Sequence, residues 1–201
     1  MISLKSYLPV LADYLDLTPD ALYERQRVLV RSGALKAVAG RGPGSGIRAM
    51  PATVTQLLIA TLATDSLAET EDKTSTLGKG AAEHGLCPLT GANDFAGALE
   101  LILSSVALAK KVSSIDVARS NLKATIYYTE RGRRYSQLSV FGKRPVLRGL
   151  HRRSVEAHLP GQAVKEICDN LQRIVGDYPT KALFEEFEAT LRGRRLLVED
   201  R

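Results

Sequence analysis

The side chains best suited to chemistry in this sequence are basic, and they gather in two stretches of the chain. Arginine and lysine donate hydrogen bonds to phosphate oxygens, and arginine also matches the acceptor edge of guanine. These residue types therefore indicate recognition of a polyanion. The first group also includes two hydroxyl side chains and one aromatic side chain. Its members are Thr18, Tyr23, Arg25, Arg27, Arg31, Lys36, Arg41, Ser45 and Arg48. The second group, around an expected hairpin, is Arg131, Arg133, Arg134, Lys143 and Arg144.

Patterns that mark nucleotide, metal and catalytic sites do not occur in the sequence. It contains neither a G-x-x-x-x-G-K-[ST] phosphate loop nor a G-x-G-x-x-G dinucleotide fingerprint. His84 and Cys87 lie three residues apart and His151 and His158 seven apart, which is not the spacing of paired zinc ligands. The His-x-x-Arg motif of tyrosine recombinases is not present at His151, because the third residue after it is Ser154 instead of arginine. We therefore expect no metal, no cofactor and no enzymatic activity.

The positive charge of the chain is unevenly distributed. The 201 residues carry a net charge of +6, and the sequence pI is about 9.4. Residues 1–50 carry +3, residues 51–100 carry −5, residues 101–150 carry +8, and the remainder is neutral. Two basic stretches around an acidic middle are typical of a protein that meets nucleic acid at one or two places. The same charge distribution would also be found on a protein that binds no nucleic acid and simply has an unevenly charged, solvated surface.

The composition is that of a globular chain. Hydrophobic residues make up 44% of it, which is enough for a core. Only two cysteines occur, Cys87 and Cys168, so a disulfide framework is not expected. The apolar run over residues 54–63 is too short to span a membrane, and no signal peptide is visible. A cytoplasmic, nucleoid-associated location is therefore expected.

Two helices and a glycine-rich hairpin are predicted in the first fifty residues. Residues 8–17 form a short amphipathic helix with Pro9 in its first turn. The second helix runs from its cap at Thr18 to about Ser32, and Gly33 ends it. Its core face is expected to carry Ala21, Leu22, Val28 and Leu29, and its outward face Tyr23, Glu24, Arg27 and Arg31, with Arg25 nearby. Extended runs at residues 35–39 and 47–50 flank the hairpin tip.

This order of elements resembles the winged helix-turn-helix of bacterial transcriptional regulators. The resemblance is carried by residues 11–22, LADYLDLTPDAL, and residues 27–35, RVLVRSGAL, which are similar to an "LA..LGLT..AL" turn followed by "L...G.L". It covers roughly a quarter of the chain and is closest in style to phage-, plasmid- and gene-transfer-agent-associated regulators. The chain has Asp16 where the pattern has glycine, and residues 1–6 are too few for the usual preceding helix. Residues 54–63 are expected to supply that supporting helix.

The resemblance implies which side chains meet DNA. Thr18, Tyr23, Arg27 and Arg31 would lie at the major groove, and Arg41 would reach the neighbouring backbone or the minor groove. The alternative is a small helical domain whose arginines are merely solvated.

The remaining residues predict a connection and an α+β domain. We expect a DNA-binding domain at residues 1–63, a loosely structured connection at 64–92 with a short helix before Gly78, and a dimerisation or partner domain at 93–201. In the last part, Asn93 caps a helix, and an antiparallel β-meander follows with strands at 122–129, 135–141 and 145–159. Two further helices, after Pro160-Gly161 and at 180–191, complete the α+β fold. The basic hairpin of the second group is either a second DNA contact or a sheet edge protected by charge.

The resulting hypothesis is a sequence-specific DNA-binding transcriptional regulator. It would be dimeric and would read an operator or promoter in double-stranded DNA with the helix at 18–32 and the wing at 35–50. RNA polymerase or another regulator is a further possible partner, and no membrane is involved. Two alternatives stay open: a replication or recombination accessory protein, and an adaptor for a protein partner.

Overall fold

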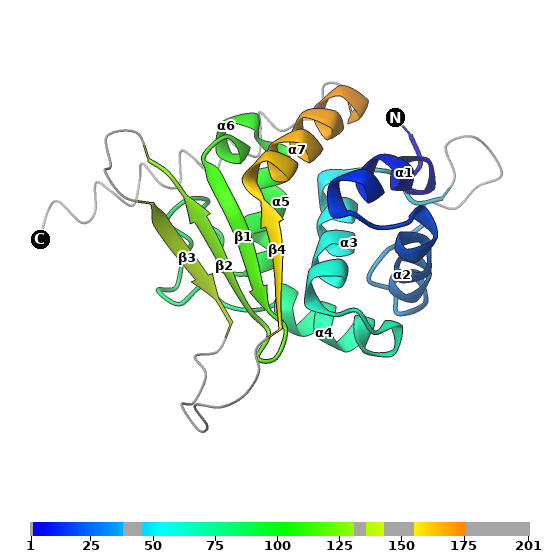
Figure 1. The fold of residues 1–201 in the computed structure, drawn as a ribbon, viewed down its shortest axis with the longest axis horizontal. Coiled ribbons are helices and arrows are strands. Elements are labelled where there is room, and N and C mark those ends of the chain that lie inside the picture. Colours follow the sequence, from blue (N-terminus) through cyan, green and yellow to red (C-terminus); the bar gives the residue numbers. More distant parts are fainter. Residues whose placement is uncertain (1, 38–45, 131–135, 143–154, 176–201) are drawn as a thin grey trace, which may run out of the picture.

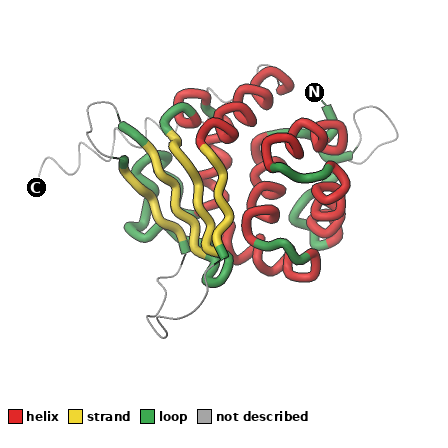
Figure 2. Tube along the Cα trace, viewed as in Figure 1, coloured by secondary structure: helices red, strands yellow, loops and turns green. Residues whose placement is uncertain are grey.

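The computed structural model describes residues 2–37, 46–130, 136–142 and 155–175. These residues form a mixed α+β fold with seven α-helices and one four-stranded antiparallel sheet (Figure 1). The helices are α1 (Leu4–Leu15), α2 (Pro19–Arg31), α3 (Pro51–Ala63), α4 (Thr70–Gly78), α5 (Phe95–Ser104), α6 (Val106–Ala109) and α7 (Gly161–Val175). The strands are β1 (Val112–Ala118), β2 (Lys123–Tyr128), β3 (Gln137–Phe141) and β4 (Glu156–Pro160). The sheet lies on one side of the molecule and α1 to α4 on the other (Figure 2).

Helix α1 begins four residues earlier than the sequence predicts. Ser3 is its N-cap, and the Ser3 hydroxyl accepts a hydrogen bond from the amide of Ser6 at 3.1 Å. Pro9 consequently lies inside the helix, so its expected place in the first turn is wrong. The cap explains the difference, because a satisfied serine cap fixes the start of a helix whatever follows it.

Helix α2 has the ends that the sequence predicts. The Thr18 hydroxyl accepts from the amide of Ala21 at 3.2 Å, and Pro19 takes the first helical position, where its missing N–H costs nothing. The last helical residue is Arg31, and Gly33 follows with φ +79°, a conformation that glycine adopts without strain. The prediction of a helix at residues 18–32 is therefore confirmed.

Helix α3 is the centre of the molecule. Ten of its thirteen residues are buried, and it packs against α2, α4, α5 and the strands β1 and β4. One hydrophobic cluster runs from Leu4 in α1 to Leu171 in α7 through this helix. The core is thus continuous across the boundary expected after residue 63.

The segment at residues 64–92 is ordered, so the expectation of a loosely structured connection is wrong. After a 3₁₀ turn at Leu67–Glu69, α4 ends at Gly78, which confirms the short helix predicted there. Thr70, Thr74 and Leu77 of α4 are buried. Two of the four buried positions of this helix are threonine and one is glycine, so its sequence has no apolar stripe. The next helix, α5, is capped by Asp94 rather than Asn93: the Asp94 carboxylate accepts from the amide of Gly97 at 2.7 Å.

The strands are antiparallel, as predicted, but the sheet is not a simple meander. The spatial order is β3-β2-β1-β4, so the last strand crosses back to pair with β1. This is the order of a Greek key. The crossing could not be predicted from local pattern, because pairing Val117 with Ala157 depends on contacts far apart in the sequence. Helix α7 packs on β1 and β4, and Phe95 of α5 contacts Phe141 of β3 with ring centroids 5.5 Å apart.

Several predicted features lie outside the described residues. These are the tip of the N-terminal hairpin with Arg41 and Ser45, the helix expected at 180–191, and the second basic group, Arg131, Arg133, Arg134, Lys143 and Arg144. Within the part of the chain that the structure describes, no helix is long and apolar enough to cross a membrane.

Candidate nucleic-acid interface

A tight turn joins α1 to α2 and fixes the angle between the two helices. Asp16 adopts the left-handed conformation, with φ 52° and ψ 47°, and the amide of Leu17 donates to the carbonyl of Ala12 at 3.1 Å. Thr18 follows in an extended conformation and caps α2. Glycine, which has no Cβ, reaches this left-handed conformation without strain, and aspartate is one of the few other residues that tolerate it.

One face of α2 is turned to solvent. Arg27, Arg31 and Thr18 at the cap are exposed, whereas Tyr23 is half-buried. Leu22 and Leu29 lie on the opposite face in the core. The outward face is made of Asp20, Tyr23, Glu24, Arg27, Val30 and Arg31.

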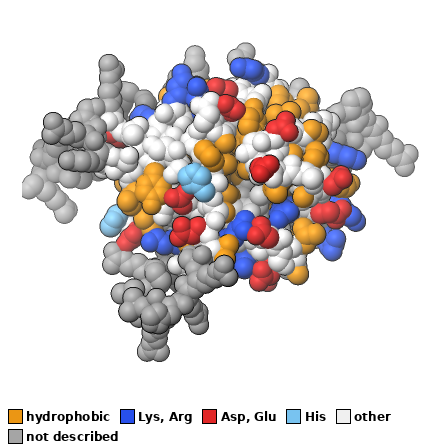
Figure 3. All heavy atoms as spheres, viewed as in Figure 1, with side chains coloured by type: hydrophobic (Ala, Val, Ile, Leu, Met, Phe, Trp, Pro, Cys, Tyr) orange, Lys and Arg blue, Asp and Glu red, His pale blue; other side chains and the backbone are white. Residues whose placement is uncertain are grey.

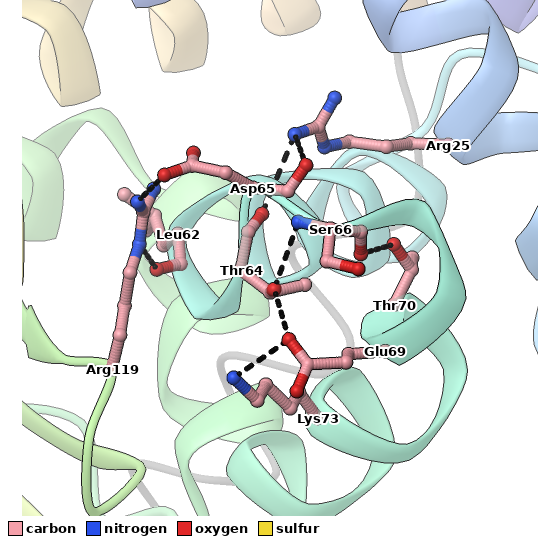
Figure 4. Close-up of polar contacts among 9 residues, drawn as sticks. All are labelled: Arg25, Leu62, Thr64, Asp65, Ser66, Glu69, Thr70, Lys73 and Arg119. Carbon is pink, nitrogen blue, oxygen red and sulfur yellow. Dashed lines mark hydrogen bonds and ion pairs between the residues drawn. The ribbon is translucent and has the colours of Figure 1, made fainter.

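Arg25 does not belong to this outward face, so its prediction as a DNA contact is corrected. Only 7% of Arg25 is exposed. Its guanidinium donates to the carbonyl of Ala21 at 3.2 Å. It also donates to the carbonyls of Thr64 and Asp65, at 3.4 Å each (Figure 4). Burial lowers the pKa of Arg25, and the Asp65 carboxylate opposes that shift.

The sequence held a signal for the position of Arg25. It stands three residues after Leu22 and four before Leu29, which is the spacing of one helical face. An arginine on an apolar stripe is expected to be buried and paired with backbone oxygens, because an unpaired buried charge is costly. A prediction from charge alone therefore placed Arg25 on the wrong side of the helix.

A second arginine closes the same end of α3. Arg119, after β1, donates to the carbonyl of Leu62 at 2.9 Å and forms an ion pair with the carboxylate of Asp65 (Figure 4). It also donates to the carbonyl of Thr61 at 3.2 Å. The last carbonyls of a helix have no partner inside the helix. Arg25 from α2 and Arg119 from the sheet satisfy carbonyls there, so they join α2, α3 and the sheet at one point.

On the exposed face of α2, Glu24 and Arg27 form an ion pair. Nη1 of Arg27 donates to both carboxylate oxygens of Glu24, at 3.0 and 3.2 Å. The two side chains are 45% and 55% exposed, so the pair contributes little to stability. Glu24 was placed on this face by its spacing but was not predicted to take part in binding.

Basic side chains gather beside α2 at the start of α1. The ammonium group of Lys5 lies 5.0 Å from the ring centroid of Tyr23, a cation–π contact. Ser3, two residues before Lys5, pairs with Arg48 as an isolated β-bridge, and Arg48 is exposed. Tyr23, a predicted residue of this surface, is therefore in contact with Lys5, which was not among the predicted residues.

Among the described residues, the two runs predicted to form the hairpin do not pair with each other. Residues 35–37 follow α2 without forming a strand, and Lys36 is exposed. The returning segment pairs with the N-terminus: the amide of Leu4 donates to Ile47 at 2.7 Å and that of Ala49 to Ile2 at 3.1 Å. The extended run predicted at residues 47–50 thus fixes the N-terminal end of α1 to the body.

Acidic and basic side chains alternate over the helical half of the molecule (Figure 3). On α2, Asp20 and Glu24 balance Arg27 and Arg31, so the outward face of this helix has no net charge. An attraction to phosphate must therefore come from cations around the helix, such as Lys5, Lys36 and Arg48.

The described nucleophiles and metal-ligating residues form no reactive group. No set of three or more His, Cys, Asp and Glu side chains could hold a metal ion within the described ranges. Both cysteines are buried. The Cys87 thiol donates to the hydroxyl of Ser139 at 3.3 Å, and burial raises the pKa of Cys168 to about 12, which keeps that thiol protonated near neutral pH.

Comparisons with known protein families, with curated proteins and with solved structures give no match.

Proposed function

We propose that this chain is a sequence-specific DNA-binding transcriptional regulator that reads double-stranded DNA with α2. The observation that carries the proposal is the unit made by α1, the left-handed turn at Asp16 and the capped helix α2, whose outward face carries Arg27 and Arg31. In helix-turn-helix proteins the second helix enters the major groove and presents its outward side chains to base edges.

The surroundings of α2 support a winged form of this unit. The segment after residue 45 returns to the start of α1 and pairs with it, next to Lys5 and Tyr23. The wing predicted at residues 35–50 would bring Arg41 to the phosphate backbone or the minor groove. Helix α3 packs against α2 and would serve as the supporting helix of the unit.

Phosphate binding and base reading are divided between different residues in this proposal. The outward face of α2 is neutral, so its contacts serve mainly to discriminate between bases. Lys5, Lys36 and Arg48 supply the positive charge for backbone contacts. The basic group around residues 131–144 would add a second backbone contact in the full chain.

The proposal includes a homodimer in the bacterial nucleoid acting at operators or promoters, with RNA polymerase or another regulator as a further partner. A dimer would present two copies of α2 to two half-sites about one helical turn apart. Light scattering on the purified protein, with and without a bound duplex, tests this part of the proposal.

Binding of the purified full chain to duplex DNA at several salt concentrations tests the proposed function. We expect a specific complex whose affinity falls steeply with salt, because phosphate contacts release counterions. Arg27→Ala should make the free energy of binding less favourable by about 1–3 kcal/mol and relax base preference. Lys36→Ala should weaken binding to all DNA sequences alike. The control is Lys110→Ala, which removes an exposed charge from the turn before β1. Equal binding by wild type and Arg27→Ala contradicts the assignment of α2.

A further inference from the structure

The ion pair of Glu24 and Arg27 belongs to α2 itself. The two residues are three positions apart, which places them as neighbours on the helix surface. Both oxygens of Glu24 accept from a single nitrogen of Arg27, at 3.0 and 3.2 Å. Both side chains are about half exposed, so a large ligand laid along this face can reach them.

This pairing leaves one edge of Arg27 unused. A guanidinium has five N–H donors, and the contact with Glu24 uses only those of Nη1. Among the described residues, no group accepts a hydrogen bond from Nε or Nη2 of Arg27. These two nitrogens form a planar fork, which is the geometry that matches O6 and N7 of guanine in the major groove.

We propose that Glu24 is a positioning residue for base recognition, which orients Arg27 so that its Nε–Nη2 edge meets a guanine. The inference rests on the proposed function, since it assigns a base to the same helix face. It follows from two properties of the pair. The carboxylate restricts an otherwise flexible arginine before DNA arrives, and it neutralises the charge that would attract any phosphate.

The second property separates this role from ordinary phosphate binding. Affinity for DNA of any sequence rises with the number of phosphates that cations neutralise. A neutral ion pair adds little to this sequence-independent affinity. The Nε–Nη2 edge of Arg27, held in one orientation, still distinguishes guanine from the other bases. Glu24 therefore lowers non-specific affinity while it raises discrimination, two effects that an experiment can measure independently.

The experiment begins with a duplex selected by the wild-type full chain from a random-sequence library. Affinity is then measured by fluorescence anisotropy for this duplex, for its single-base substitutions and for a duplex of unrelated sequence. The wild type should show one position with a roughly 5- to 150-fold preference for guanine, the range that one bidentate arginine gives. In Glu24→Ala this preference should fall by about two- to five-fold, the range that an exposed ion pair supports, while affinity for the unrelated duplex rises.

Three further variants separate positioning from charge. Glu24→Gln keeps an oxygen that can accept from Arg27, so it should retain most of the guanine preference while its affinity for the unrelated duplex rises. Asp13→Asn removes an exposed negative charge from α1 and should raise affinity for every duplex alike, with base preference unchanged. In Arg27→Ala the added change Glu24→Ala should cause no further loss of preference. Circular dichroism of each variant checks that the fold is kept.

The possible results separate the two proposals. If the wild type binds every duplex with the same affinity, both the proposed function and the role of Glu24 are wrong. If the wild type discriminates and Glu24→Ala keeps the full guanine preference, the regulator stands and the role of Glu24 is refuted. Loss of preference in Glu24→Ala together with its retention in Glu24→Gln and Asp13→Asn supports the inference.

Discussion

Arg25 and Arg27 are two residues apart on α2 and have opposite surroundings. Arg25 is buried and donates to three backbone carbonyls, while Arg27 is exposed and bound to one carboxylate. Removing a buried donor leaves its acceptors unsatisfied, whereas removing one partner of an exposed ion pair changes stability little.

This contrast gives a prediction for the two arginines. Arg25→Ala should lower the free energy of unfolding by about 2–4 kcal/mol, and Arg27→Ala should change it by less than about 0.5 kcal/mol. Urea unfolding of both variants checks the prediction. Similar losses of stability in the two variants would show that Arg25 is not the more strongly stabilising of the two arginines.

The thiol of Cys168 gives a prediction for alkaline pH. Burial raises its pKa from the ordinary 9.0 to about 12, so the unfolded chain loses this proton at a lower pH than the folded chain does. The stabilising effect is fully present below about pH 9 and is lost as pH rises toward 12. The free energy of unfolding should therefore fall over this range, and the fall should be less steep in Cys168→Ala. An unchanged slope in that variant would contradict the prediction.

At the scale of elements, the turn between α1 and α2 determines how α2 is presented. Asp16 has φ 52° there, a conformation that costs a residue with a Cβ about 1–2 kcal/mol, although aspartate tolerates it better than most. Asp16→Gly should consequently be more stable than Asp16→Ala by about 1 kcal/mol. Thermal unfolding of the two variants tests this, and a more stable alanine variant would mean that the turn has another conformation.

Elements with local start and stop signals could be predicted from the sequence, and elements that depend on distant contacts could not. Thr18, Pro19 and Gly33 define α2 because capping involves only neighbouring residues. The position of β4 beside β1 depends on pairing between residues about forty positions apart, and no local pattern encodes it. In the candidate site, residue type and spacing predicted the exposure of Arg27 and Arg31. The burial of Arg25 could be predicted only from the helical period, and the contact of Lys5 with Tyr23 depends on the fold.

At the scale of the whole molecule, α3 joins the candidate reading unit to the sheet. Its buried face contacts α2 on one side and α4 and α5 on the other. Two of the three carbonyls that accept hydrogen bonds from Arg25 belong to Thr64 and Asp65, which lie beyond the expected domain boundary. The reading unit is thus built into the same core as the rest of the chain.

A fragment of residues 1–63 should therefore not fold on its own. It would expose the apolar surface of α3 and leave Arg25 without two of its acceptors. We expect the fragment to lack a cooperative thermal transition by circular dichroism, and the full chain to unfold in one step. Cooperative unfolding of the fragment would instead show an independent N-terminal domain.

The measurement that tests the central claim most directly is the genome-wide occupancy of the tagged protein in the organism that encodes it. It should be made for the wild type and for a variant carrying Arg27→Ala and Arg31→Ala, which keeps Arg25 and the core intact. We predict a small number of sharp promoter peaks that are lost in the variant. Peaks that persist in the variant, or the absence of peaks in the wild type, would contradict the claim that α2 reads DNA.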